Sequence, residues 1–122
     1  MLNVRSFKVY ADGALGSRGA ALKNPYSDLK SHKGVFITSK DSIEKLAYQL
    51  AATPFQMNTH AIGDDANKVV LDAYKKALVF SDDPRWRIEH AQIIDTLDIK
   101  LFNRKIIPSI QPTHATSDMY WA

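Results

Sequence analysis

Two short segments that each end in a histidine constrain this sequence more than any other feature. They are NTHAIGD at 58–64 and RIEHAQ at 87–92, and in each a run with β character precedes a helical pattern. His60 and His90 lie 30 positions apart, about the length of one strand-plus-helix unit. In a parallel α/β barrel, equivalent positions of successive units meet at the carboxyl ends of the strands, where such barrels keep their chemistry. We therefore predict that the two imidazoles meet there and indicate a metal site.

Alternating and helical hydrophobic patterns extend this unit along the chain. They predict strands over 5–11, 56–61, 86–92 and 106–111, and helices over 41–52, 64–78 and 95–103. Strands that alternate with helices of this length favour a parallel sheet. Four strands with three crossovers make about half of an eight-stranded barrel, which typically takes about 250 residues. The expected fold class is therefore α/β, a partial TIM barrel that looks like part of something larger.

Three parts of this pattern are less regular. Residues 13–39 carry no long periodic segment, and only Val35–Thr38 has the composition of a short strand. A loop of this length is either a binding loop or lid, or an insertion without a role. Pro108 weakens the prediction of the last strand, because proline lacks a ladder donor. The helix predicted at 95–103 is expected to begin at Asp95 and to bury Leu97, Leu101 and Phe102.

Composition excludes several classes of protein. The 122 residues are 45% hydrophobic and 24% charged, which fits one soluble globular unit. Without cysteine there are neither disulfides nor thiolate metal ligands. The net charge of +3 is spread along the chain rather than clustered, so we expect no nucleic-acid partner. The sequence has neither a membrane-spanning apolar run nor a secretory signal, so we expect no association with a membrane. The compartment is undetermined, with the cytoplasm favoured.

Three residues are candidate metal ligands. Either histidine alone is better explained as a strand-end side chain that hydrogen-bonds to backbone, but the equivalent positions of His60 and His90 favour ligation. Lys8 occupies the matching place in the first strand. A buried amine with a lowered pKa can capture carbon dioxide as a carbamate, an anion able to bridge two metals. A lysine paired with Asp12, or simply solvated, explains Lys8 equally well.

Other polar residues near these strands receive lesser roles. Asp64 and Asp65 follow Gly63 and are expected to cap a helix rather than bind metal. Glu89 precedes His90 and should face away from it, pairing with Arg87 or orienting a neighbour. Gln111 and His114 follow the last strand and are candidates for substrate binding at the same rim, with solvent exposure the alternative for His114.

Four segments in order carry a resemblance to a known family. They are KVYADGALGSRGA at 8–20, HAIGD at 60–64, RIEHAQ at 87–92 and PSIQPTH at 108–114. Together they resemble the YtcJ-like branch of the metal-dependent amidohydrolase superfamily, amidohydrolase family 3. The resemblance implies a distorted (β/α)8 barrel of which residues 1–122 form approximately strands four to seven. It also implies hydrolysis of amide or related C–N bonds of a small-molecule substrate.

The resemblance assigns roles to the candidate ligands. Lys8 matches the strand-four lysine, which is carboxylated in the bridging form, while His60 and His90 match the metal histidines of strands five and six. The implied cofactor is a divalent metal, with zinc favoured and one or two ions. The paired His-x-His of the first strand and the aspartate of the eighth strand are absent. No general base is therefore assigned within this chain, and the isolated segment is expected to be inactive.

A second reading needs no metal. The chain can instead be a non-catalytic α/β module that binds a partner or forms homo-oligomers through open sheet edges. A metal titration distinguishes the two readings, because only the hydrolase requires an ion.

Overall fold

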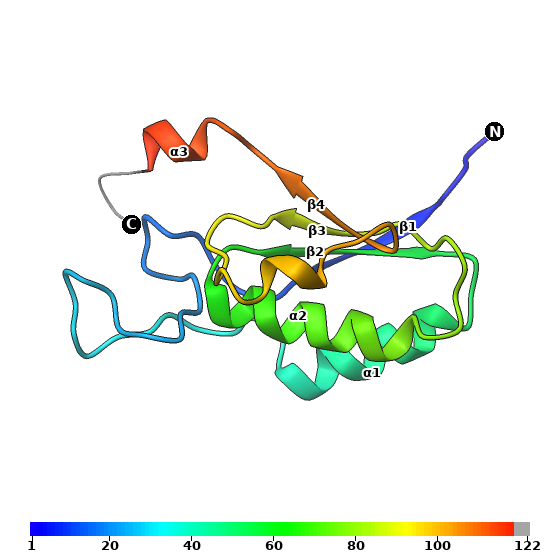
Figure 1. Ribbon diagram of the computed structural model, residues 1–122, viewed down its shortest axis with the longest axis horizontal. Helices are drawn as coiled ribbons and strands as arrows, with labels where there is room; N and C mark the ends of the chain where they lie inside the picture. The colour runs from blue at the N-terminus through cyan, green and yellow to red at the C-terminus, as the bar shows by residue number, and fades with distance from the viewer. Residues whose placement is uncertain (119–122) are drawn as a thin grey trace.

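A computed structural model describes residues 1–118, in which four parallel strands form a single sheet in the order β1-β2-β3-β4. The elements are β1 (Ser6–Tyr10), α1 (Lys40–Ala51), β2 (Gln56–Ala61), α2 (Asp64–Ala77), β3 (Trp86–His90), the 3-10 helix η1 (Ile99–Leu101), β4 (Ile106–Ile110) and α3 (His114–Ser117). Figure 1 shows α1 and α2 together on one face of the sheet. The predicted α/β class with four parallel strands is confirmed, whereas closure into a barrel stays a prediction.

The core lies between the sheet and helices α1 and α2. Strand residues that point toward the helices are apolar and fully or almost fully buried; they include Met57, Ala61, Trp86, Ile88 and Ile106. Tyr74 of α2 meets them from the helix side, with its ring 4.9 Å from that of Trp86 in an edge-on arrangement. Its buried hydroxyl bonds with Thr59 Oγ1 at 2.7 Å and donates to the carbonyl of Met57. Burial of this one apolar face orients the other face of the sheet away from both helices.

The helix boundaries follow local chemistry. The Ser39 side chain accepts from the Ser42 amide and caps α1. Helix α2 begins after Gly63, which offers no side chain, so the prediction that Asp64 or Asp65 caps it was wrong. Both aspartates instead lie in the first turn, where negative charge complements the helix dipole. Asp64 accepts from the Lys23 amide of the long loop, and Asp65 pairs with Lys40.

Some expected elements are shorter than the sequence pattern suggests. Only the three residues of η1 are helical within 95–103, and Leu97 is 71% exposed rather than buried. Residues 35–38 form no strand; Phe36 makes one isolated bridge with Asp12. The third strand ends at His90, two residues early. Pro108 does lie in a strand, and β4 pairs only with β3, which is the edge position where proline is tolerated. The end of the polar tail, 119–122, lies outside the described residues.

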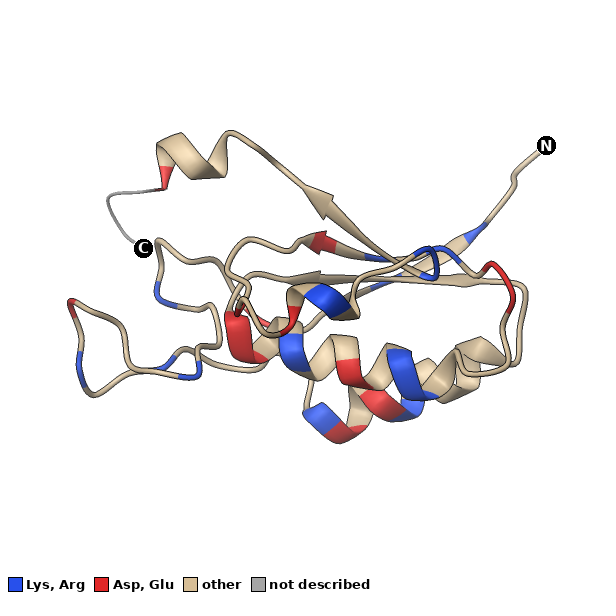
Figure 2. Cartoon of the chain, in the orientation of Figure 1, with Lys and Arg blue, Asp and Glu red and all other residues tan. Residues whose placement is uncertain are grey.

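Charged residues are distributed evenly over the helical face. Figure 2 shows Lys and Arg interspersed with Asp and Glu along α1 and α2. Within residues 1–118, no helix is long and apolar enough to cross a membrane.

The long loop, residues 13–39, is anchored at the amino end of α2. The carbonyl of Ala21 accepts from the amides of Asp65 and Ala66, at 3.1 and 3.3 Å. These amides belong to the first helical turn, whose N–H groups have no hydrogen-bond acceptors within the helix itself. Leu15, Ala20, Tyr26 and Ile62 form a second small apolar cluster beneath the loop. Its attachment point is therefore packed and hydrogen-bonded, so the loop is held to the β2–α2 turn.

Replacing Gly63 by alanine should destabilise the protein, because the two segments touch at this glycine. An added Cβ would lie 2.0 Å from the Ala21 carbonyl oxygen, which is backbone and cannot rotate away. Overpacking of this kind costs roughly 1–3 kcal/mol or more. Urea denaturation measures the loss, with Gly16→Ala as the control, because nothing lies within 4 Å of a Cβ there. Equal stability of the two variants would contradict the close packing of loop and turn.

Candidate metal centre

His60 and His90 meet at the carboxyl ends of two adjacent strands. The first lies in β2 and the second ends β3, and the centroids of their rings are 4.7 Å apart with the planes close to perpendicular. The His60 side chain is only 12% exposed. Its Nε2 atom is buried and has no hydrogen-bond partner. A buried polar atom normally has a partner, so this nitrogen is available for a ligand.

The two histidines reach this arrangement by different backbone routes. His60 pairs with Glu89 in the sheet register, while His90 pairs with Ala61, one residue further along. Strict alternation would therefore send the His90 ring toward the helices, on the side of Ile88. His90 and Ala91 instead have φ values of 73° and 44°, in the left-handed region. This turn at the strand end breaks the alternation and brings the ring to the side of His60.

Lys8 lies deeper in the sheet than the sequence suggests. Its register partner is Asn58, and the partner of His60 is Tyr10, so the expected matching place was wrong by two residues. Two residues correspond to about 6–7 Å along a strand. Lys8 still faces the same side as His60, because both side chains follow the same alternation. It lines a cavity of about 420 Å³ with Asn58, Arg87, Glu89, His90, Ser109 and Gln111.

Glu89 shares this cavity, contrary to the expectation that it faces away from His90. Glu89 faces the open side of the sheet by ordinary alternation, in register with His60, and the left-handed backbone at His90 brings the His90 side chain to that same side. The other expectation for Glu89 is confirmed, since Arg87 Nε donates to its Oε1 atom at 2.8 Å and Arg87 Nη2 forms an ion pair with the same oxygen at 2.8 Å. The site therefore holds a carboxylate that the sequence pattern excluded. The signal that was missed is the His-Ala pair at the strand end.

Gln111 and His114 come to the same rim, as predicted. Gln111 Oε1 accepts a hydrogen bond from His90 Nδ1 and contacts His114 Nε2 at 2.8 Å. The other nitrogen of His114 bonds with Asp118, which also accepts from Gln92. Because an amide oxygen only accepts, Nδ1 of His90 carries a proton, and the lone pair of the neutral ring lies on Nε2. His90, Gln111 and His114 also line a second cavity, of about 380 Å³.

Asp12 lies immediately beside His60. Its carboxylate is completely buried, and its Oδ1 atom is 3.6 Å from Nε2 of His60. Sequence reasoning treated this residue as part of a turn and as a partner for Lys8. The carboxylate instead accepts hydrogen bonds from the backbone amides of Ala21, Ile62 and Gly63.

Burial controls the protonation of these groups. Desolvation lowers the pKa of His60, and the nearby His90 and Lys8 lower it further, so the neutral, ligating form is favoured. Desolvation also lowers the pKa of Lys8, although Glu89 opposes the effect. The pKa of Asp12 is raised by burial, while the three amide donors hold it down.

These residues fit part of a metal centre. Two imidazoles present nitrogen atoms to one region, and His60 Nε2 lacks any other partner. Among residues 1–118, however, no three His, Asp or Glu side chains converge as a ligand set. A catalytic zinc usually has three protein ligands and a water. The described residues therefore match a partial set, to which Lys8 can contribute only after it gains a ligating group.

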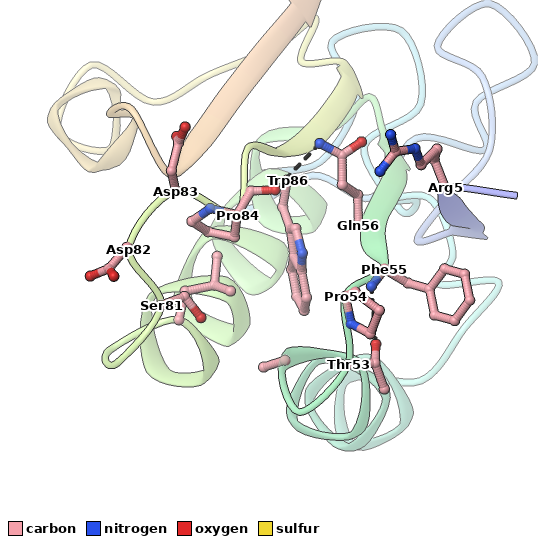
Figure 3. A pocket seen from close by; sticks show the side chains of 12 residues that line it. Arg5, Thr53, Pro54, Phe55, Gln56, Ser81, Asp82, Asp83, Pro84 and Trp86 are labelled. Atoms are coloured by element: carbon pink, nitrogen blue, oxygen red, sulfur yellow. Dashed lines mark hydrogen bonds between the residues drawn. The ribbon is translucent and has the colours of Figure 1, made fainter. Parts of the chain in front are cut away.

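A larger cavity than either of these lies at the other end of the sheet. It has a volume of about 460 Å³ and is lined by residues at the amino ends of the strands, among them Arg5, Gln56, Pro84 and Trp86. Figure 3 shows these side chains around the opening, with Gln56 donating to the Pro84 carbonyl. In parallel α/β sheets, ligands bind at the carboxyl ends, and the opposite end serves stability. Chemistry therefore locates the site more reliably than cavity size.

A parallel α/β unit with paired imidazoles at the carboxyl ends of its strands has the fold and partial site of a metal-dependent hydrolase. The sequence profile described as Amidohydrolase family matches residues 1–122, and the chain belongs to that family. The chain is 35% identical over 117 residues to "Putative amidohydrolase YtcJ" of Bacillus subtilis, covering 95% of this chain. It is 32% identical over 114 residues to "Protein LONG AFTER FAR-RED 3" of Arabidopsis thaliana, covering 91%. The resemblance to the YtcJ-like branch is thus confirmed.

Two solved structures show the same arrangement of elements. They are described as uncharacterized metal-dependent hydrolases, one from Pyrococcus furiosus and one from Pyrococcus horikoshii. Each superposes with a TM-score of 0.82 over 96% of this chain, at 31% and 30% identity. The chain spans 24% and 23% of those structures, and 20–22% of the curated relatives. It therefore corresponds in length to about a fifth to a quarter of these proteins.

Proposed function

We propose that the protein containing this chain hydrolyses an amide or related C–N bond of a small molecule, using a divalent ion held partly by His60 and His90. The observation that carries this proposal is the pair of rings 4.7 Å apart, with His60 Nε2 buried and unpartnered. Zinc is favoured because neutral imidazole suits it. When bound, such an ion lowers the pKa of water and polarises a substrate carbonyl.

The residues of this chain have distinct proposed roles. His60 and His90 supply ligating nitrogens. Gln111 holds the His90 ring in one orientation by accepting a hydrogen bond from His90 Nδ1. Gln111 and His114 line the adjoining cavity, where we propose that they contact the substrate. We assign no general base among residues 1–118. That group and the remaining ligands are expected elsewhere in the complete protein, since this chain spans 20–22% of its curated relatives.

Lys8 is proposed as the carbamate bridge. The Lys8 side chain is exposed in the described part of the chain, but partial desolvation still lowers its pKa, which increases the fraction of neutral amine. A neutral amine adds carbon dioxide and releases a proton, which leaves a carboxylate on Nζ. This group would add anionic oxygen ligands on the same side of the sheet as the paired imidazoles, and it permits a second ion.

The direct test is metal removal from the complete protein. Chelation should abolish hydrolysis of amide substrates, and restoring zinc should recover it. Full activity in metal-free protein, confirmed by elemental analysis, would rule the proposal out.

The pH dependence of the metal-free protein should reveal the state of His60. Its pKa in the folded state is lowered below the usual 6.5, so the unfolded chain binds the proton more readily. Stability should therefore fall as the pH drops below about 6.5, until the lowered folded pKa is passed. Urea denaturation from pH 7 to pH 5 should show a smaller loss for His60→Gln than for the wild type. Identical pH profiles would contradict the buried, neutral state of His60.

A non-catalytic role in self-association is supported by the sheet edges. β1 and β4 each have one unpaired side, and Phe7 and Ile110 are among the exposed apolar residues on them. Such edges invite pairing between chains. The isolated 122-residue chain is therefore expected to form dimers or larger species in light scattering. A monomer at high concentration would count against it.

A further inference from the structure

Asp12 connects three segments at one carboxylate. Its Oδ1 atom accepts from the amide of Ile62 at 2.9 Å, and its Oδ2 atom accepts from Gly63 and Ala21 at 2.8 and 2.9 Å. Ile62 and Gly63 form the turn that directly follows the strand of His60. Ala21 belongs to the long loop, and its carbonyl in turn holds the first amides of α2. The carboxylate therefore joins the end of β1, the loop and the β2–α2 turn.

The same carboxylate faces the free nitrogen of His60. Asp12 Oδ1 and His60 Nε2 are 3.6 Å apart, and Asp12 is completely buried. Hydrogen bonds from amides to a carboxylate are stronger than neutral ones and fix its position. Because both of its oxygens already accept backbone N–H groups, Asp12 has little freedom to move onto an ion. Its negative charge nevertheless favours a cation at that nitrogen.

We infer that Asp12 is a positioning residue of the metal centre: its carboxylate fixes the turn that directly follows His60 and places negative charge 3.6 Å from His60 Nε2, where it favours a bound cation. This inference rests on the proposed function for the identity of the ligand. The same contacts link the long loop to the metal-binding end of the sheet.

The variant Asp12→Asn tests this directly. The asparagine amide can take two orientations. With its oxygen in the place of Oδ2, the hydrogen bonds from the Ala21 and Gly63 amides are kept; with its amino group there, these two donors would face another donor. The favoured orientation therefore puts the amino group at the Oδ1 position, opposed to the Ile62 amide and near His60 Nε2. There it can donate to the Nε2 lone pair and compete with the ion. Loss of such a partner typically weakens metal binding about 10–100-fold.

The matched control is Asp64→Asn. Asp64 also accepts a loop amide, that of Lys23 at 2.9 Å, but within residues 1–118 its carboxylate forms no hydrogen bond or ion pair with His60 or with the amides of Ile62 and Gly63. Zinc affinity of the complete protein is measured by competition with a chromophoric chelator. We expect Asp12→Asn to lose at least about tenfold, and Asp64→Asn to match the wild type. Unchanged affinity in Asp12→Asn, or equal losses in both variants, would overturn the inference.

A second measurement needs no metal. The ¹⁵N NMR signal of His60 Nε2 in metal-free protein should shift in Asp12→Asn as that nitrogen gains a hydrogen bond, and stay in place in Asp64→Asn. If the wild type binds no zinc, the proposed function fails, and this signal alone decides the role of Asp12: a shift supports it and an unchanged signal overturns it. Should Asp12→Asn not fold, Asp12→Glu keeps the charge but displaces it. An intermediate loss of affinity is then expected, and wild-type affinity would overturn the inference.

Discussion

The variants His60→Ala and His90→Ala should each lose metal and hydrolytic activity together. Each removes one of two imidazoles that lie 4.7 Å apart at the rim of the sheet. Replacement of an outer partner alone usually weakens binding about 10–100-fold, so removal of a ligand should cost at least about a hundredfold. The measurements are elemental analysis and amidase activity of the complete protein at fixed zinc concentration.

His32→Ala is the matched control for these variants. His32 lies in the long loop, where its Nε2 atom bonds with the Arg18 carbonyl and its ring stacks near Tyr26. It takes no part in the proposed centre, so its variant should retain metal and activity. Full activity of His60→Ala or His90→Ala would exclude the proposed ligation. Loss of both properties in His32→Ala as well would indicate general unfolding.

Replacing Trp86 by alanine should cause the largest loss of stability. Trp86 is 1% exposed and packs edge-on against Tyr74, which is itself fully buried. Trp86 is the first residue of β3 and packs against helix α2, at the end of the sheet away from the histidines. Deletion of a large aromatic side chain from a core costs about 3–5 kcal/mol, because a cavity remains. Urea denaturation of the complete protein measures this difference.

Phe80→Ala separates this packing effect from the loss of an aromatic residue as such. Phe80 is 99% exposed, so its removal should change stability by no more than about 0.5 kcal/mol. A loss in Trp86→Ala as small as that in Phe80→Ala would contradict the assignment of Trp86 to the core. Metal affinity of any Trp86→Ala protein that folds should remain close to that of the wild type, because the two ends of the strands are separate.

Much of the fold could be predicted because its signals are local. The helical pattern of α2 and the alternation in β1 to β4 arise from residues a few positions apart, and they place the elements within about two residues. The helix expected at 95–103 failed for a local reason as well. Leu97 fits the helical period but lies on the surface, and a period alone does not specify what covers it.

The candidate site could likewise be predicted only where its features depend on local sequence patterns. Three things could be predicted from local patterns: the residue types, the order of strands and helices, and the side of the sheet on which Lys8 and His60 lie, since alternation has a period of two. The meeting of His60 with His90 depended on register and on two left-handed residues at the end of β3, which bring the His90 ring to the side of the sheet that His60 and Glu89 already share. Only the tertiary structure decided the role of Asp12. Its amide partners lie 9, 50 and 51 positions away, and no short-range pattern reports which distant donors a buried carboxylate will find.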